Sequence, residues 1–296
     1  MQRQWIAGVF VLGWLAGCSD GTTPPLDAGA DAPVVVDALD APSTVDAPAV
    51  ADAPAEDLPP EPVDSGRVIP SCPSPVNGGD GGVAVRGHGH IFGPNGGPVR
   101  DAVVTVLEHP GWCARTGSDG AYAFTGFTPG ERVTLEMHHE NHWPVQTSTL
   151  LVAPEGLERV GFQSPTHGIF RVLAQYLHIT PEPDRCQIAT TVVAAAYRGT
   201  YDPGGHGEVG ATVTIDPPLP AAAGPVYFRY LSPSAIVPAR ELTETSLDGG
   251  VLFLNVPAGD YVLSAHKAGV RFNQVAIRCR AGMLVNASPP WGLQAQ

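Results

Sequence analysis

Asp119-Gly120-Ala121-Tyr122-Ala123-Phe124 recurs along the chain as Asp248-Gly249-Gly250-Val251-Leu252-Phe253. In each stretch a closing glycine, Gly130 or Gly259, comes eleven residues after the aspartate. Each copy reads as a turn dipeptide, an alternating apolar strand and a second turn, which is the pattern of a β-meander. The sequence therefore predicts one small β-rich unit that occurs twice.

Alternating apolar segments surround both copies and predict further strands. The candidates are residues 83–91, 102–107, 133–137, 145–152, 159–163, 209–215 and 226–231. The count from the matching alanines, Ala102 and Ala211, to the Asp-Gly pairs is about 20 residues longer in the second copy. The extra residues lie between positions 216 and 246. An insertion of that length often carries a binding function.

One strand after the first copy has two different faces. Val133, Leu135 and Met137 share its apolar face. The other face carries Arg132, Thr134, Glu136 and His138, which we expect to be solvated.

Between the two copies the apolar period changes to three and four residues. The apolar positions are Ile169, Val172, Leu173, Tyr176 and Leu177. Ser164 can cap this segment, Pro165 suits the first helical position, and Pro181 ends it. We predict one amphipathic helix that connects the two β units.

The first 18 residues predict a bacterial lipoprotein signal. Arg3 precedes an apolar run, and Leu15-Ala16-Gly17-Cys18 has the form of a lipobox. The run is short for a membrane span, and the thiol of Cys18 is available for acylation. We expect Cys18 to be the lipid-anchored first mature residue, and Ser19 after it favours the outer membrane. An uncleaved anchor or an unmodified secretory signal is the alternative.

Residues 19–65 predict a disordered tether. They carry eleven acidic residues and no basic residue, with repeated Asp-Ala-Pro units. Like charge and frequent proline leave too little apolar surface to offset the entropy of folding. We expect a passive spacer; a specific binding segment is the alternative.

The charge of the remaining chain argues against nucleic acid as a partner. The net charge of the whole chain is −13; subtracting −11 for residues 19–65 and +1 for Arg3 leaves −3 for residues 67–296. That part contains a single lysine, Lys267. Binding to phosphates requires clustered Lys and Arg.

Four cysteines besides Cys18 predict two disulfides in an exported protein, and four cysteines allow three connectivities. Cys279 continues the apolar face of Val275 and Ile277, and Cys186 shares a face with Ile188. We predict the pairs Cys72 with Cys113 and Cys186 with Cys279. Reduced buried thiols are the alternative.

Together these residues resemble the carboxypeptidase regulatory-like domain. The matching motifs are Val85-Arg86-Gly87, Gly97-Pro98-Val99, Ala102 to Val106, Asp119 to Phe124 and Pro129-Gly130, with Gly210 to Val213, Asp248-Gly249, Phe253 and Gly259 to Leu263 in the second copy. The resemblance implies a transthyretin-like β-sandwich of the carbohydrate-binding-like folds. Because the motifs are mostly turns and core positions, they indicate fold more than function.

The histidines are the candidates for chemistry. His138-His139-Glu140-Asn141-His142 departs from the zinc-protease pattern, because Trp143 occupies the position of the second ligand. His88 and His90 share one face of a strand. With His138 or His142 they could form a transition-metal site. The sequence contains no nucleophile elbow, phosphate loop or dinucleotide fingerprint, so we predict no cofactor.

These observations predict an all-β protein with two transthyretin-like β-sandwich domains joined by one short amphipathic helix. The expected boundaries are a signal at 1–18, a disordered acidic linker at 19–82, a first sandwich at 83–163, a connector at 164–182 and a second sandwich at 183–296. We expect a non-enzymatic, lipid-anchored cell-envelope protein whose partner is a glycan or a surface protein. A metal-binding protein or metal-dependent enzyme centred on His88, His90, His138 and His142 is the alternative. Trp112, Trp143, Tyr227 and Tyr230 are the candidates for stacking on sugars.

Overall fold

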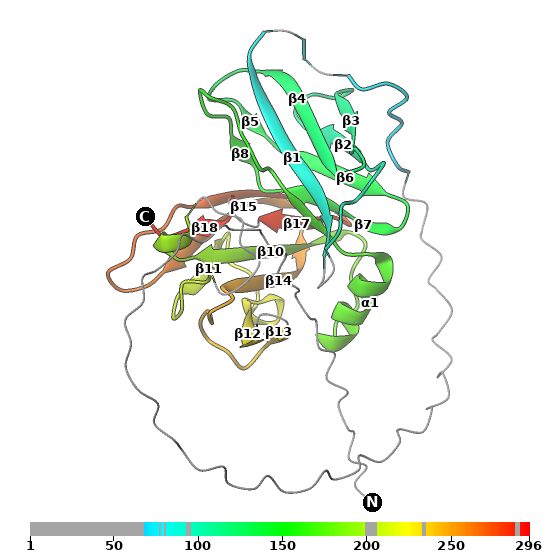
Figure 1. Cartoon of the computed structure of the whole chain (residues 1–296). Helices are drawn as coiled ribbons and strands as arrows, with labels where there is room; N and C mark the ends of the chain where they lie inside the picture. The colour runs from blue at the N-terminus through cyan, green and yellow to red at the C-terminus, as the bar shows by residue number, and fades with distance from the viewer. Residues whose placement is uncertain are drawn as a thin grey trace, which may run out of the picture. The chain divides into compact units, whose positions relative to one another are not determined.

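A computed structural model describes residues 68–76, 78–79, 81–92, 96–198, 206–232, 235–287 and 291–296. Those from Ile69 onward belong to one compact unit. The lipobox with Cys18, and the tether of residues 19–65, lie outside the described residues. The described part is mostly β, with one α-helix, and its sheets stack in a sandwich-like arrangement (Figure 1).

The first repeat unit stacks a small sheet on part of a large one. The small sheet has the order β4-β1-β9. Its strands are β1 (Val83–Ile91), β4 (Ala121–Phe127) and β9 (Phe162–Ser164). Opposite it lie β2 (Val103–Val106), β3 (Cys113–Arg115), β6 (Leu135–His139) and β7 (His142–Thr147), while β5 (Arg132–Val133) pairs with β8 (Leu150–Leu151).

The second repeat unit has a similar arrangement. Its small sheet has the order β11-β15-β16. The strands are β11 (Thr212–Asp216), β15 (Gly259–His266) and β16 (Val275–Cys279). Opposite it lie β10 (Arg185–Val193), β12 (Val226–Ser232), β13 (Ala235–Ala239), β14 (Gly250–Pro257), β17 (Leu284–Ala287) and β18 (Leu293–Gln294).

One sheet runs through both units. Its order is β13-β12-β14-β10-β17-β7-β6-β2-β3, with β18 paired to β10. The junction is the parallel pairing of β17 with β7, in which Leu284 lies opposite Val145 and Asn286 opposite Thr147. Sequence analysis did not predict this junction, because pairing between segments so far apart has no local signal.

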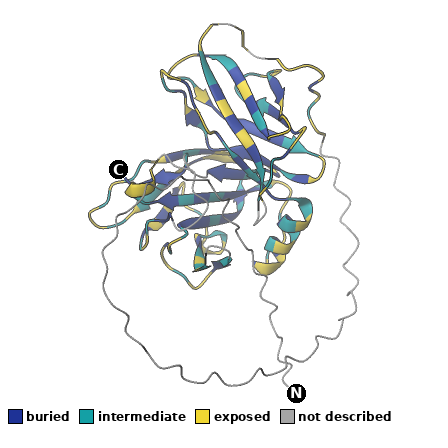
Figure 2. Ribbon diagram, viewed as in Figure 1, coloured by how far each residue is buried: buried dark blue, intermediate teal, exposed yellow. Residues whose placement is uncertain are grey.

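Two large clusters of buried side chains lie on either side of this junction (Figure 2). The first includes Phe124, Phe127 and Phe162, all fully buried, and the second is built around Ile188, Phe253 and Leu263. Alternate strand residues point inward, as the period-two pattern predicts. The predicted aromatic anchors Phe124 and Phe253 therefore each belong to the core of their own unit.

The repeated Asp-Gly pair forms the same turn twice. The Asp119 carboxylate accepts a hydrogen bond from Ala121 N at 3.0 Å, and the Asp248 carboxylate accepts one from Gly250 N at 2.9 Å. Gly120 and Gly249 have φ angles of 79° and 76°, in the left-handed region that glycine enters without strain. The two copies of the repeat therefore share the backbone geometry of this turn.

The single helix among the described residues is α1 (His167–Tyr176). The predicted helix is present, but its cap was predicted wrongly and its buried face only in part, since Leu177 is buried as predicted. Thr166 caps it by accepting from Ile169 N at 3.2 Å, because Ser164 is the last residue of β9. Two short 3-10 segments, Ala195–Tyr197 and Ala221–Ala223, complete the helical structure of this part.

The buried face of α1 is set by tertiary contact rather than by the strongest apolar pattern. Phe170 and Ala174 are buried, whereas the predicted Val172 and Tyr176 are about half exposed, at 49% and 53%. Trp143 stacks on Phe170 with ring centroids 3.7 Å apart and an angle of 11° between the planes. That stack turns Phe170 inward.

The predicted linker of residues 19–82 ends too late. Cys72 is buried, Val76 N donates to Cys113 O at 2.8 Å, and Gly78 N donates to Thr125 O at 3.1 Å. The segment after Ile69 therefore packs on the first unit, because the disulfide and these backbone bonds hold it there.

The predicted insertion of residues 216–246 holds a β-hairpin. Strands β12 and β13 pair with each other, and β12 also pairs with β14. The hairpin places Tyr230 opposite Ile236.

Candidate functional site

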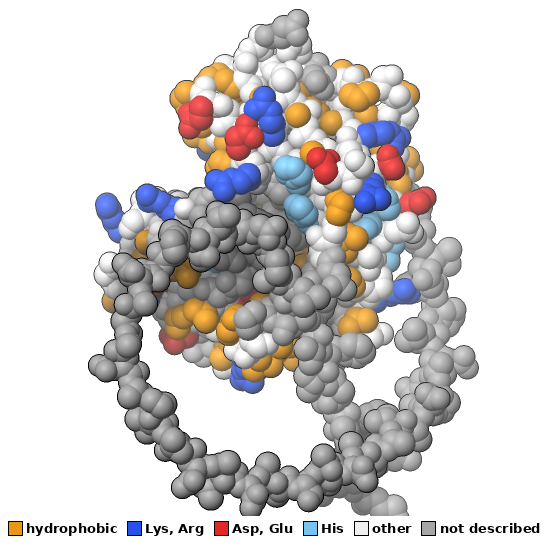
Figure 3. Space-filling view, in the orientation of Figure 1, with side chains coloured by type: hydrophobic (Ala, Val, Ile, Leu, Met, Phe, Trp, Pro, Cys, Tyr) orange, Lys and Arg blue, Asp and Glu red, His pale blue; other side chains and the backbone are white. Residues whose placement is uncertain are grey.

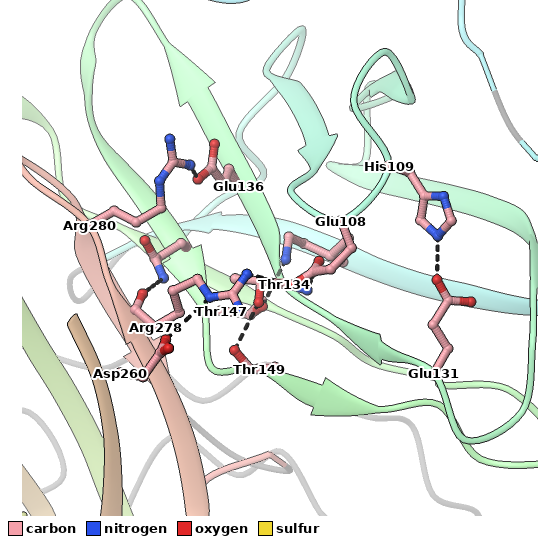
Figure 4. Close-up of polar contacts among 12 residues, drawn as sticks. Glu108, His109, Glu131, Thr134, Glu136, Thr147, Thr149, Asp260, Arg278 and Arg280 are labelled. Carbon is pink, nitrogen blue, oxygen red and sulfur yellow. Dashed lines mark hydrogen bonds and ion pairs between the residues drawn. The ribbon is translucent and has the colours of Figure 1, made fainter. Parts of the chain in front are cut away.

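The polar face predicted to be solvated is buried in part: Arg132 is exposed as predicted and His138 is partly buried, but for Thr134 and Glu136 the prediction was wrong. Thr134 is fully buried and Glu136 is 7% exposed. The reason is that Arg278, in β16, and Arg280, which follows it, lie over this face of β6 (Figure 4). We call Glu108, Thr134, Glu136, Gln146, Thr149, Arg278 and Arg280 the polar interface.

Several contacts cross the polar interface. Glu136 forms an ion pair with Arg280, and Gln146 Nε2 donates to Arg278 O at 2.5 Å. Arg278 lies 3.6 Å from Glu108 and 3.3 Å from Asp260, both measured from guanidinium nitrogen to carboxylate oxygen. These charges hold elements of the two units against each other.

Backbone groups extend the same network. Thr134 N donates to the Glu108 carboxylate at 2.7 Å, and the hydroxyls of Thr134 and Thr149 lie 2.9 Å apart. Thr149 N donates to Ala276 O at 2.9 Å. A buried carboxylate is retained only where it is paired and hydrogen-bonded, as here. The chemistry of the polar interface is therefore structural.

The four cysteines form the predicted disulfides. Cys72 pairs with Cys113, and Cys186 pairs with Cys279; the Cα atoms are 5.9 Å and 5.8 Å apart. Each bridge lies within one unit. The second is part of the core of its unit.

The histidines of the alternative metal hypothesis lie in different settings. His88 and His90 lie on the outer face of β1, with ring centroids 5.9 Å apart. His142 is buried, and its Nδ1 lies 3.2 Å from Ser164 O; burial lowers the pKa of His142, and repulsion by nearby His139 and His167 adds to the effect. His138 Nε2 lies 3.5 Å from Glu136 Oε2. The described residues bring together no group of three or more His, Cys, Asp or Glu side chains suited to a metal ion.

Most of the aromatic side chains predicted to stack on sugars instead pack against other side chains of the protein or are buried. Trp143 stacks on Phe170, and Trp112 stacks on His109 with centroids 4.0 Å apart. Tyr227 is buried, and its hydroxyl accepts from Val213 N at 3.0 Å. Tyr230, on the inserted hairpin, is only partly buried and belongs to neither large core cluster.

Two tyrosine hydroxyls that could suggest chemistry are structural. Tyr122 donates to Val160 O at 2.5 Å, and burial raises the pKa of Tyr122 well above its ordinary value. Burial also raises the pKa of Tyr227. Both phenols therefore stay protonated and act as hydrogen-bonding groups.

No helix in the described part of the chain has both the length and the apolar character needed to cross a bilayer.

No family model and no curated protein matches this chain. Among solved structures it is similar to the Bacillus anthracis TIE protein, at 12% identity and a TM-score of 0.22, over 72% of this chain and 34% of that one. It is also similar to a minor pilin of Streptococcus agalactiae (12% identity, 72% and 95% covered, TM-score 0.23) and to the shaft pilin SpaA of Lactobacillus rhamnosus GG (8%, 72% and 96%, TM-score 0.20). The chain spans about a third of the TIE chain. TM-scores this low support no argument, so function is inferred from this chain's own residues.

Proposed function

We propose that this protein is a non-enzymatic, lipid-anchored protein of the cell envelope. In this proposal Cys18 is acylated, residues 19–65 act as a spacer, and two carboxypeptidase regulatory-like sandwiches are displayed as one rigid structural or binding module. Ser19 favours the outer membrane.

The observation that carries the proposal is the continuous sheet that joins the two units. It is reinforced by the polar interface and by a disulfide in each unit. The ionisable side chains Glu108, Glu136 and Arg280 are used to hold this arrangement together. In this proposal the acidic, proline-rich residues 19–65 would reach about 3 Å per residue, which would suit display of a stiff body at a distance from a membrane.

Replacement of Cys18 tests the anchor. Cys18→Ser should move the protein from the membrane fraction to the soluble fraction and abolish labelling by a radioactive fatty acid. Ser19→Ala is the matched control and should stay in the membrane. Retention of Cys18→Ser in membranes would contradict the lipid anchor.

A glycan is the preferred ligand class, with a surface protein as the alternative. Tyr230 supports it, because its ring is on the inserted hairpin and outside both cores. Aromatic stacking on sugar rings needs such an accessible face. Binding to a glycan array should be lost in Tyr230→Ala and kept in Tyr176→Ala, an exposed helix residue that serves as control. Equal binding by both variants would remove Tyr230 from the proposed site.

A further inference from the structure

We propose that His88 and His90 form a two-histidine chelate for a divalent transition-metal ion such as Ni²⁺, Cu²⁺ or Zn²⁺, with the remaining coordination positions open to water or an external ligand. This inference does not depend on the proposed envelope function.

The backbone of β1 places both imidazoles on one side of the sheet. His88 is exposed and His90 half-buried, with the inward positions between and beside them taken by Gly87 and Gly89. The ring centroids are 5.9 Å apart and the planes differ by 23°. Imidazole nitrogens bind such ions at about 2.0–2.1 Å. Small side-chain rotations therefore bring one nitrogen of each ring to a shared ion.

The surroundings of His90 suit a metal ligand. Its ring is hydrogen-bonded to the backbone of Gly96. A ligating histidine typically donates its other N–H to a backbone carbonyl or carboxylate, which fixes the tautomer.

The charges around the pair also favour a cation. The carboxylate of Asp119 interacts electrostatically with His88. Arg86, on the same face, is ion-paired with Glu158 at 2.6 Å, so its charge is compensated. Histidine side chains are exposed over the end of β1 (Figure 3).

A second histidine pair, His139 and His142, has rings that lie closer together, but both rings are hydrogen-bonded to the backbone. Its ring centroids are 4.9 Å apart. His139 Nδ1 accepts from Asn141 N at 3.1 Å, and His142 Nδ1 is bonded to Ser164 O. The bond at His142 leaves its Nε2 available, but at His139 the accepting Nδ1 leaves the proton of the neutral ring on Nε2. A metal ion would have to displace that proton or break the bond to Asn141 N, which makes the pair a suitable comparison for His88 and His90.

The test is calorimetric titration of the untagged full chain with NiCl₂, repeated with CuCl₂. We expect one site, weakened at least tenfold by His88→Ala and by His90→Ala, with the double variant no weaker than the weaker single variant. His138→Ala and His139→Ala should bind within twofold of the parent. Thermal unfolding without metal serves as the folding control, and His88→Gln with His90→Gln replace any alanine variant that fails to fold.

Two results would overturn the chelate. One is a loss below tenfold for either the His88 or the His90 variant. The other is a tenfold loss in His139→Ala, which would place the ion at the second pair. Electron paramagnetic resonance of the Cu²⁺ complex should show two imidazole nitrogens in the parent and fewer in each single variant at His88 or His90.

Discussion

The two Asp-Gly turns share their backbone geometry but not their electrostatics. Asp119 is exposed, and the hydrogen bond from Ala121 N lowers its pKa. Asp248 makes the equivalent bond to Gly250 N, yet burial raises its pKa to about 6. The difference is the hairpin inserted in the second unit. A methyl group added at Gly250 would lie 2.6 Å from the Phe228 ring of β12, so that ring covers the second turn.

This comparison shows that a repeated sequence can specify a turn, while an insertion elsewhere changes the electrostatic environment of the aspartate in that turn. The same insertion carries Tyr230, which is only partly buried and lies outside both large core clusters. The second unit therefore differs from the first at the inserted hairpin, which carries the residue that we propose for glycan binding.

The largest expected effect is loss of a disulfide. The disulfides of the two units close loops of different length, so their removal should destabilise the protein by different amounts. The sequence separations are 41 and 93 residues. Closing such loops lowers the entropy of the unfolded chain and stabilises the protein by about 4 and about 5 kcal/mol. Replacing Cys72 and Cys113 by alanine should destabilise less than replacing Cys186 and Cys279. Denaturant unfolding under non-reducing conditions measures both, and the reverse order would show that loop entropy is not the main term.

The second effect concerns the core aromatics. Phe124→Ala and Phe253→Ala should each destabilise the protein by about 3–5 kcal/mol, because each leaves a cavity among buried side chains. Phe272→Ala is the control, since that ring is only partly buried against its core cluster. Urea unfolding measures all three. A loss below about 1 kcal/mol for either core variant would contradict its place in a packed core.

The third effect concerns the junction of the two units. Arg280→Ala should cost about 2 kcal/mol, because it leaves the buried Glu136 carboxylate without its partner. Arg86→Ala is the matched control. It breaks an ion pair whose two side chains are more than half exposed, and it should cost less than about 1 kcal/mol. Equal costs in urea unfolding would mean that the polar interface is solvated in solution.

The last effect is a pH dependence that tests the electrostatic difference between the two turns. Because the pKa of Asp248 is raised in the folded state, folding binds a proton between pH 4 and 6, and stability falls as the pH rises through that window. Asp248→Asn keeps the acceptor for Gly250 N and should remove this loss, raising stability at pH 7.5 by up to about 3 kcal/mol.

Asp119→Asn is the matched control for that prediction. The pKa of Asp119 is lowered in the folded protein, so the effect of pH on stability has the opposite sign: Asp119 stabilises the fold at neutral pH, and this stabilisation is lost as the pH falls. Thermal unfolding from pH 4 to pH 8 measures both variants. The same pH slope for Asp248→Asn and the parent would show that Asp248 is solvated.

The strands, the two cores and the disulfide pairs could be predicted because they have local signals. Alternation placed Phe124 and Phe253, and the face of Val275 and Ile277 placed Cys279. The parallel pairing of β17 with β7 has no such signal. Thr134 and Glu136 alternate with apolar residues whether they face water or the arginines of the other unit, so the pattern alone could not distinguish the two.

The candidate sites were predicted less well for the same reason. His88 and His90 were correctly placed on one face of a strand. The burial of His142 and the stacking of Trp143 on Phe170 depend on contacts made by α1 and β9, which the local sequence does not encode. Tyr230 was one of four equal candidates until the cores were known.

The central claim is that the two repeats have separate cores held as one module by a shared sheet and the polar interface. Hydrogen exchange by mass spectrometry on Phe253→Ala tests it most directly. We expect amides of β10, β14 and β15 to exchange faster by about two to four orders of magnitude, as a loss of about 3–5 kcal/mol implies, while those of β1, β2 and β4 change less than tenfold. If protection in β1, β2 and β4 fell as far as in β14, the protein would have a single cooperative core and the claim would be wrong.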